Sequence, residues 1–124
     1  SNYDGRLGTL MAGFKAQNND DFYTFSIYNA MVALSHAMAK AKSTDPVKVA
    51  AALDGLRFSG FNGDSEIRKS DHQVQQGLWI SKWQKVDAKN KYSLENTGYT
   101  FAPVKYLDAY IASTPTSCQM KRPG

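Results

Sequence analysis

Residues 21–55 read DFYTFSIYNAMVALSHAMAKAKSTDPVKVAAALDG. Apolar residues recur at helical spacing, and helix-forming alanines are frequent, so the pattern predicts one long helix over about residues 22–42. Because apolar side chains cover much of its circumference, we expect this helix to be buried on several sides. Asp45 and Pro46 predict the N-cap and first position of a shorter helix, which Gly55 ends. Together the two helices predict a helical hairpin.

Outside this hairpin the pattern predicts one more helix and several short strands. Residues 3–17 carry an apolar face, which predicts a helix weakened by its glycines. Residues 65–69 and 78–86 alternate between apolar and polar side chains around a polar turn at 70–73, which predicts a β-hairpin. From residue 87 onward no clear period is visible, and residues 114–124 predict an extended tail on the surface.

The composition is that of an ordinary globular protein, which argues against disorder: 42% of residues are hydrophobic and 21% are charged. No apolar run is long enough to span a bilayer, and the first residues carry no signal-peptide pattern. A chain of 124 residues has room for one modest core, and its large helix lacks a partner of equal size. We therefore expect an exposed apolar patch that faces protein outside the chain, or self-association.

The net charge of +4 raises the question of nucleic-acid binding. The cations are scattered through the chain in loose groups, so a solvated surface is the favoured interpretation. A small nucleic-acid binder remains an alternative that predicts salt-dependent retention on DNA or RNA. We expect no nucleic-acid partner.

The sequence carries no enzyme motif. The glycines near the start do not follow a strand, so they make no phosphate loop, and no G-x-S-x-G elbow is present. We interpret Asp20 and Asp21 as a polar turn or helix cap, and Asp71 with His72 as a turn rather than an acid–base pair. No catalytic residue and no cofactor are expected.

Cys118 is the only cysteine of the chain. With His36 and His72 it makes poor material for a zinc site, which needs about four ligands. A catalytic Cys–His pair has no local support either. We expect no metal site, and in an exported protein an odd cysteine suggests a disulfide partner outside this chain.

Aromatic residues gather at the start of the long helix: Phe22, Tyr23, Phe25 and Tyr28. Core packing accounts for most of these rings. A ring at the N-terminal edge of a helix, beside a turn, can instead project into a ligand cleft, because such clefts are commonly walled by aromatic side chains.

Motifs spread over nearly the whole chain resemble the C-terminal part of the branched-chain amino-acid type of ABC-importer substrate-binding proteins. Their order and spacing carry the resemblance, and no single motif is decisive. In chain order they are Tyr28-Asn29-Ala30, Ser43-Thr44-Asp45-Pro46, Leu53-Asp54-Gly55, Phe58-x-Gly60, Gly63, Arg68-x-x-Asp71-His72-Gln73 and the tail Thr116-Ser117-Cys118-Gln119-Met120-Lys121-Arg122-Pro123.

The resemblance implies an α/β chain with part of the type I periplasmic-binding-protein fold, in which two lobes are joined by hinge strands around a ligand cleft. The chain resembles about the last third of that fold: the long helix hairpin and short hinge-side strands, incomplete without the upstream lobes. Residues 1–20 would end the second lobe. Residues 21–124 would form the C-terminal part of the first lobe, with a hinge crossing and the extended tail.

The resemblance also implies a function and site residues. Tyr23, five residues before the tyrosine of the first motif, is expected to wall the side-chain pocket, with Phe22 and Thr24 as weaker candidates. Cys118 would pair with a cysteine of the missing first lobe. The parent protein would lie in the periplasm, with a lipid anchor as a further option, and would bind a branched-chain amino acid or related small carboxylate for delivery to an ABC permease in the membrane.

An alternative from a different class is a stand-alone helical protein-interaction domain that dimerises through its apolar helix. It predicts a stable, well-folded dimer.

Overall fold

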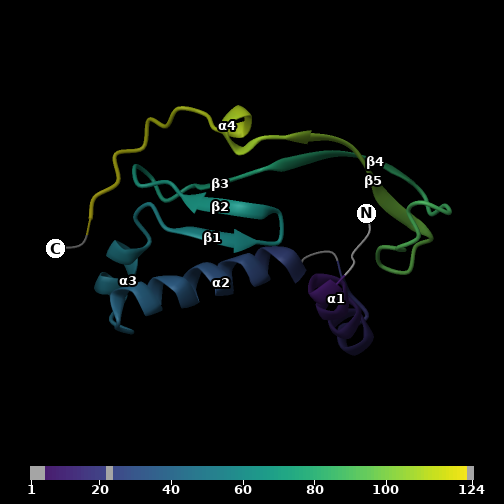
Figure 1. Ribbon diagram of the computed structural model, residues 1–124, viewed down its shortest axis with the longest axis horizontal. Coiled ribbons are helices and arrows are strands. Elements are labelled where there is room, and N and C mark those ends of the chain that lie inside the picture. Colours follow the sequence, from purple (N-terminus) through teal and green to yellow (C-terminus); the bar gives the residue numbers. More distant parts are fainter. Residues whose placement is uncertain (1–4, 22–23, 123–124) are drawn as a thin grey trace. The chain divides into compact units, whose positions relative to one another are not determined.

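The computed structural model describes residues 5–21 and 24–122 (Figure 1). It is a mixed α/β structure, as expected. The chain order is α1 (Gly5–Asn18), α2 (Thr24–Ala41), α3 (Pro46–Ala52), β1 (Arg57–Gly60), β2 (Gly63–Ile67), β3 (Val74–Gln76), β4 (Leu78–Lys85), β5 (Tyr99–Leu107) and α4 (Ala109–Ala112). The three helices predicted from periodicity and capping are confirmed as α1, α2 and α3.

The chain divides into two compact units. Unit 1 comprises Ser1–Ile27 and Trp79–Tyr106, and unit 2 comprises Tyr28–Leu78 and Leu107–Gly124. The backbone therefore passes from one unit to the other within α2, β4 and β5. The lobe boundary expected after residue 20 concerns the whole two-lobed protein, and it stays a prediction.

Unit 2 has an apolar core between α2, α3 and the first sheet. Its buried members are Ala33, Ala37, Val49, Ala52, Leu56, Phe58 and Ile67. The α2 members are alanines four residues apart, and side chains this small let the helix approach the sheet closely. In Figure 1 α2 runs alongside β1, and α3 lies at its C-terminal end.

The contact between α2 and the β1–β2 turn depends on Asn29 and Gly60. Asn29 Oδ1 accepts a hydrogen bond from the Phe61 backbone N–H at 2.6 Å. A β-carbon built on Gly60 would lie 2.7 Å from the same oxygen. Only glycine therefore lets this turn approach α2 without moving Asn29, which explains why the sequence has Asn29 and Gly60 at these positions.

The caps of α3 follow the sequence prediction. Asp45 accepts a hydrogen bond from the Lys48 N–H at 3.0 Å, and Pro46 begins the helix. At the other end Lys40 of α2 donates to the carbonyl oxygens of Ala52 and Asp54, at 2.9 and 3.3 Å. Gly55 follows with a φ of +63°, as expected of a residue that ends a helix.

The strand pairing differs from the predicted hairpin of residues 65–69 and 78–86. The polar turn instead connects β2 with β3, and β2 pairs antiparallel with both β1 and β3. β4 pairs with β5, a strand that the sequence analysis missed. Pro103 lies inside β5, where a proline argues against a strand, and the partner strand β4 lies beyond a long loop, so the local sequence did not predict β5.

Unit 1 contains α1 and the β4–β5 ribbon. Its buried side chains include Met11 on α1, Leu94 in the connecting loop, and Thr100 and Ala102 on β5. Leu10 and Phe14, which share the predicted apolar face of α1, are 42% and 38% exposed. Met11 is the one fully buried residue among the described residues of α1, so this face is only partly covered within the chain.

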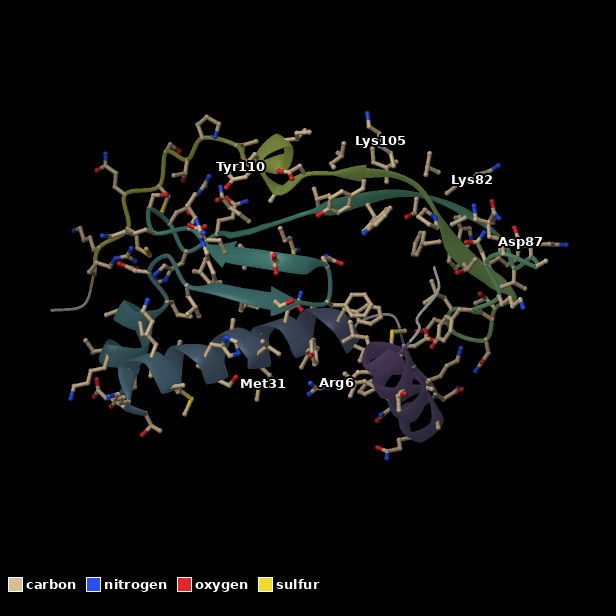
Figure 2. The ribbon with its side chains drawn as sticks, viewed as in Figure 1. Arg6, Met31, Lys82, Asp87, Lys105 and Tyr110 are labelled. Atoms are coloured by element: carbon tan, nitrogen blue, oxygen red, sulfur yellow. The ribbon has the colours of Figure 1, made fainter. Side chains whose placement is uncertain are left out.

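The expectation that the long helix is buried on several sides is wrong for this chain. Met31 is 60% exposed and Leu34 is 41% exposed, while Ala33 and Ala37 are buried. Figure 2 shows Met31 on the side of α2 that faces away from β1 and β2. The helix therefore packs on one face and leaves a second apolar face uncovered.

Candidate ligand-binding site

The residues predicted to wall the ligand pocket are Phe22, Tyr23 and Thr24. Phe22 and Tyr23 fall outside the described residues. Thr24 is the first residue of α2 and is 9% exposed. Its hydroxyl donates to the backbone carbonyl oxygen of Asp21 at 3.5 Å. Its assignment to a ligand pocket stays a prediction, and the structure here shows how the start of α2 is held.

Asp21 is the centre of a buried polar cluster in unit 1, the Asp21 cluster, which also contains Lys15, Tyr92 and Glu95. The Asp21 carboxylate is 0% exposed. Its Oδ1 accepts from the Glu95 backbone N–H at 2.9 Å, and its Oδ2 accepts from the Tyr92 hydroxyl at 2.9 Å. In return Glu95 Oε1 accepts from the Asp21 backbone N–H at 2.9 Å.

Lys15 supplies the positive charge of the Asp21 cluster from the last turn of α1. Its Nζ lies 2.9 Å from Asp21 Oδ2 and also donates to the Ser93 carbonyl oxygen. The same ammonium lies 4.8 Å from the centre of the Tyr92 ring, a cation–π contact. Lys15 thus ties α1 to the loop after β4 through Ser93 and Tyr92, and to the segment before α2 through Asp21.

The surroundings of Asp21 change its pKa in two directions. Burial raises the pKa of its carboxyl group, because the charged form loses water. The hydrogen bonds from Lys15, the Glu95 N–H and Tyr92 lower it, and the net pKa is below the ordinary value. Asp21 is therefore ionised in the folded protein at neutral pH.

Sequence analysis interpreted Asp21 as part of a turn or a helix cap and missed the cluster. The Tyr92 and Glu95 partners lie 71 and 74 residues away along the chain. No local pattern could have linked them. The one local signal was an acidic residue directly before a predicted apolar helix, which predicts a cap equally well.

A second polar network, the tail clamp, lies in unit 2 and consists of Asp54, Arg68, Asp71, His72 and Arg122. Arg68 forms a two-pronged ion pair with Asp71, with Nε 2.8 Å from Oδ1 and Nη2 bonded to Oδ2. Its Nη1 donates to the Thr114 carbonyl oxygen at 2.7 Å. The hydrogen bond from Arg68 holds the pKa of Asp71 well below its ordinary value.

The other half of the tail clamp surrounds Asp54, after α3. His72 Nε2 lies 2.6 Å from Asp54 Oδ1, and Arg122 Nη2 lies 2.8 Å from the same oxygen. The hydrogen bond from His72 and the charge of Arg122 lower the pKa of Asp54. His72 has a φ of +59° in the turn between β2 and β3, so the predicted turn at Asp71 and His72 is confirmed.

The tail clamp holds an otherwise irregular segment at both ends. Arg68 holds it at Thr114 and Arg122 holds it at Asp54, and between them Cys118 is exposed with a free thiol. The predicted extended surface tail is confirmed over residues 114–122. Whether Cys118 pairs with a cysteine outside this chain stays a prediction.

The β4–β5 ribbon presents exposed aromatic rings in unit 1. The rings of Trp79 and Tyr106 lie 4.9 Å apart. Trp83 stacks on Tyr99 at 5.7 Å and meets Phe101 at 4.9 Å. Trp79 is 55% exposed and Trp83 is 45% exposed. In Figure 2 the labelled Lys82 and Lys105 extend from the same ribbon.

One cavity in unit 2, of about 130 Å³, is lined by polar side chains that include Arg68, Gln75 and Ser113. It is well below the ~300 Å³ of ordinary small-molecule pockets, so we assign no amino-acid ligand to it. Among the described residues no group of three His, Cys, Asp or Glu side chains is placed to hold a metal ion. In residues 5–21 and 24–122 no helix combines the length and hydropathy that crossing a membrane requires.

Comparison with known proteins assigns the fold. Residues 7–90 match the family model described as periplasmic binding protein. The chain belongs to the periplasmic binding protein family. No curated protein matches the chain. The resemblance and the partial type I fold inferred from the sequence motifs are thereby confirmed.

Two solved structures are similar to nearly the whole chain. The crystal structure of an ABC-type branched-chain amino acid transporter from Rhodopseudomonas palustris CGA009 is 28% identical with a TM-score of 0.65, and the match covers 97% of this chain. The closed conformation of the leucine-, isoleucine-, valine-, threonine- and alanine-binding protein from Brucella ovis is 19% identical with a TM-score of 0.77, over 98% of this chain. The matches cover 29% and 33% of those two chains, so this chain spans about a third of their length.

Proposed function

We propose that this chain is part of the substrate-binding protein of an ABC importer and that the intact protein binds an amino acid, branched-chain or a related small carboxylate. The observation that carries the proposal is the family match over residues 7–90. The 28% identical structure, whose title names a branched-chain amino acid transporter, supports this ligand class. The role is delivery to a permease in the membrane, without catalysis.

The proposed ligand wall consists of Tyr23, with Phe22 and Thr24 beside it. An aromatic ring at this position would contact the ligand's side chain, as pockets of this kind combine apolar walls with few polar groups. The residues that bind the charged ends of the amino acid would come from the part of the family fold that lies outside this chain. The intact protein would work in the periplasm, and a lipid anchor on it is a further part of the proposal.

The uncovered apolar surfaces fit a chain that needs the rest of its fold. Met31 and Leu34 on α2 and the aromatic side chains of the ribbon are exposed here. Burial of such surface stabilises a protein by about 25 cal/mol per Å², so a folded partner for these faces is favourable. We propose that the remainder of the parent protein covers them.

Isothermal titration with leucine, isoleucine, valine, threonine and alanine tests the proposed function. We expect the intact protein to bind at least one of these at micromolar concentration, and we expect the 124-residue chain alone to bind none. Micromolar binding by the chain alone would show that a complete site lies within it, contrary to the proposal. A lack of binding by the intact protein would refute the ligand class.

Cys118 is proposed to form a disulfide with a cysteine of the parent protein outside this chain. An oxidising periplasm permits such a bond. Intact-mass measurement before and after reduction should show that the thiol is protected in the intact protein and becomes free on reduction. A free thiol without reduction would contradict the pairing.

A dimerisation domain is the second candidate function, and the exposed Met31 and Leu34 face of α2 favours it. Sedimentation of the chain distinguishes the two. A stable, well-folded dimer supports the alternative. A monomer whose apolar faces stay accessible supports a piece of a larger fold.

A further inference from the structure

Three segments meet at the Asp21 carboxylate. Lys15 comes from the end of α1, Tyr92 and Glu95 from the loop between β4 and β5, and Asp21 itself stands three residues before Thr24, where α2 begins. Hydrogen bonds to a carboxylate are directional, so three donors on two oxygens fix the relative placement of these segments. An apolar side chain of the same size would leave that placement free.

A buried ion pair is a poor way to stabilise a fold. Taking a charged group out of water is unfavourable, and well-packed apolar pairs are often as stable or more stable. Since Asp21 is completely buried, its charge is expensive to keep there. A buried ion pair such as Asp21–Lys15 is favoured where the relative placement of segments matters more than stability.

The loop that the Asp21 cluster holds is conformationally strained. Glu95 and Asn96 have φ values of +51° and +54°, in the left-handed region that costs a non-glycine residue energy. Two side-chain contacts keep them there: Glu95 Oε1 accepts from Asp21 N–H, and Asn96 Nδ2 donates to Asn19 Oδ1 at 3.1 Å. Strained residues persist only where the surroundings hold them in place.

We infer that Asp21 is a positioning residue for ligand binding: its carboxylate locks the loop of residues 92–97 to the start of α2, next to the proposed pocket wall. The inference rests on the proposed function. Asp21 does not contact the ligand. It acts through Lys15, Tyr92 and Glu95, and its loss lets the start of α2 and the loop move independently.

The test compares variants of the intact protein. Asp21→Asn keeps the shape of the side chain but cannot accept from all three donors. The double variant Asp21→Leu with Lys15→Met removes both charges and packs apolar atoms in their place. For each variant we measure the thermal midpoint, the affinity for the five amino acids named above, and amide hydrogen exchange at Leu94 and Thr97. The Leu94 N–H donates to the Tyr99 carbonyl oxygen at the start of β5, and the Thr97 N–H donates to the Leu94 carbonyl oxygen.

We expect Asp21→Asn to weaken affinity at least tenfold and to speed loop exchange at least tenfold. The double variant should recover the thermal midpoint of the unmodified protein, because apolar packing restores stability. Its affinity should stay weak and its loop exchange fast, because the directional hydrogen bonds are still absent. Asp64→Asn, at an exposed carboxylate on β2, is the control and should leave affinity unchanged. If the double variant regains affinity together with stability, Asp21 is only structural and the inference is overturned.

Amide hydrogen exchange at Leu94 and Thr97 tests this inference independently of the proposed function. If the intact unmodified protein binds none of the five amino acids, the proposed function fails, and exchange alone then decides whether Asp21 positions the loop. Unchanged exchange in Asp21→Asn overturns the inference in either case. If Asp21→Asn does not fold, the double variant carries the same comparison.

Discussion

Each of the two units has a different kind of interior. Unit 1 surrounds a fully buried carboxylate, Asp21, with a lysine, a tyrosine hydroxyl and the backbone N–H of Glu95. Unit 2 has an apolar core cluster, and its tail clamp contains one largely buried ion pair, Arg68–Asp71, with side chains 16% and 7% exposed, and one more open pair, Arg122–Asp54, with side chains 35% and 22% exposed. Loss of the Asp21 charge in unit 1 leaves the Lys15 ammonium without its carboxylate, whereas water can reach the Arg122–Asp54 pair of unit 2, whose side chains are 35% and 22% exposed.

Replacing Asp21 with alanine should have the largest effect. It leaves the Lys15 ammonium, 18% exposed, without its carboxylate and leaves the Tyr92 hydroxyl without its acceptor. Removal of one partner from a buried pair destabilises proteins by about 3 kcal/mol or more. Urea unfolding of the intact protein measures the change, with Asp64→Ala, at an exposed carboxylate on β2, as the control. A loss under about 1 kcal/mol would mean that water reaches Lys15 and that the two units differ less than the structure implies.

Acidification should destabilise unit 1 through the same carboxylate. The pKa of Asp21 in the folded protein is below its ordinary value of 3.8, so its ionisation adds stability above that value. This stability is lost as the pH falls from about 4 through the folded pKa. The slope of unfolding free energy against pH in that range should be shallower in Asp21→Asn. If the unmodified protein and Asp21→Asn have equal slopes, the loss of stability in acid comes from other carboxylates, such as Asp71.

In unit 2 the corresponding weak point is steric. Gly60→Ala would place a β-carbon 2.7 Å from Asn29 Oδ1, which must then give up its bond to the Phe61 N–H. Overpacking of this kind costs about 2 kcal/mol. In an Asn29→Ala background the same change should cost much less, because the clashing oxygen is gone. Unfolding of the four proteins of this cycle gives the coupling, and additive effects would show that the turn does not depend on this contact.

The N-cap of α3 should matter less than either contact. Asp45→Ala removes the acceptor of the Lys48 N–H, and the loss of such a cap costs about 1 kcal/mol. Asp45→Asn keeps an acceptor and serves as the control, with a change of a few tenths. A loss in both variants of the same size would point to the charge of Asp45 instead of its hydrogen bond.

Sequence pattern was enough for local structure and for the family, but not for the site. Helix periods and the Asp45–Pro46 cap predicted α1, α2 and α3, because those signals depend on near neighbours. The pairing of β4 with β5 and the partners of Asp21 were missed, because they join residues far apart along the chain. Tertiary contacts of that kind leave no period to detect.

The motifs that carried the family resemblance turn out to hold unit 2 together. Asn29 and Gly60 make the helix–turn contact, Asp45 caps α3, and Arg68 with Asp71 closes the tail clamp. None of these residues is among those predicted to contact the ligand. This is why the motifs identified the fold while the ligand wall stays a prediction, and why Cys118, exposed within one of them, has no assigned partner.

Arg68→Lys should have the smallest effect on global stability and a clear local one. A lysine ammonium cannot bond both oxygens of Asp71 and the Thr114 carbonyl oxygen together, because it lacks the planar fork of arginine. The tail from residue 114 to residue 122 should therefore loosen at one end, while Arg122 still binds Asp54. We expect the unfolding midpoint to stay within error and amide exchange to rise at Cys118, whose N–H bonds to Thr116 Oγ1 at 3.0 Å. Adding Arg122→Gln should release the other end and raise exchange further. A large drop in the midpoint in either variant would show that the tail clamp supports the core of unit 2, so that its charges matter as much for stability as Asp21 does in unit 1.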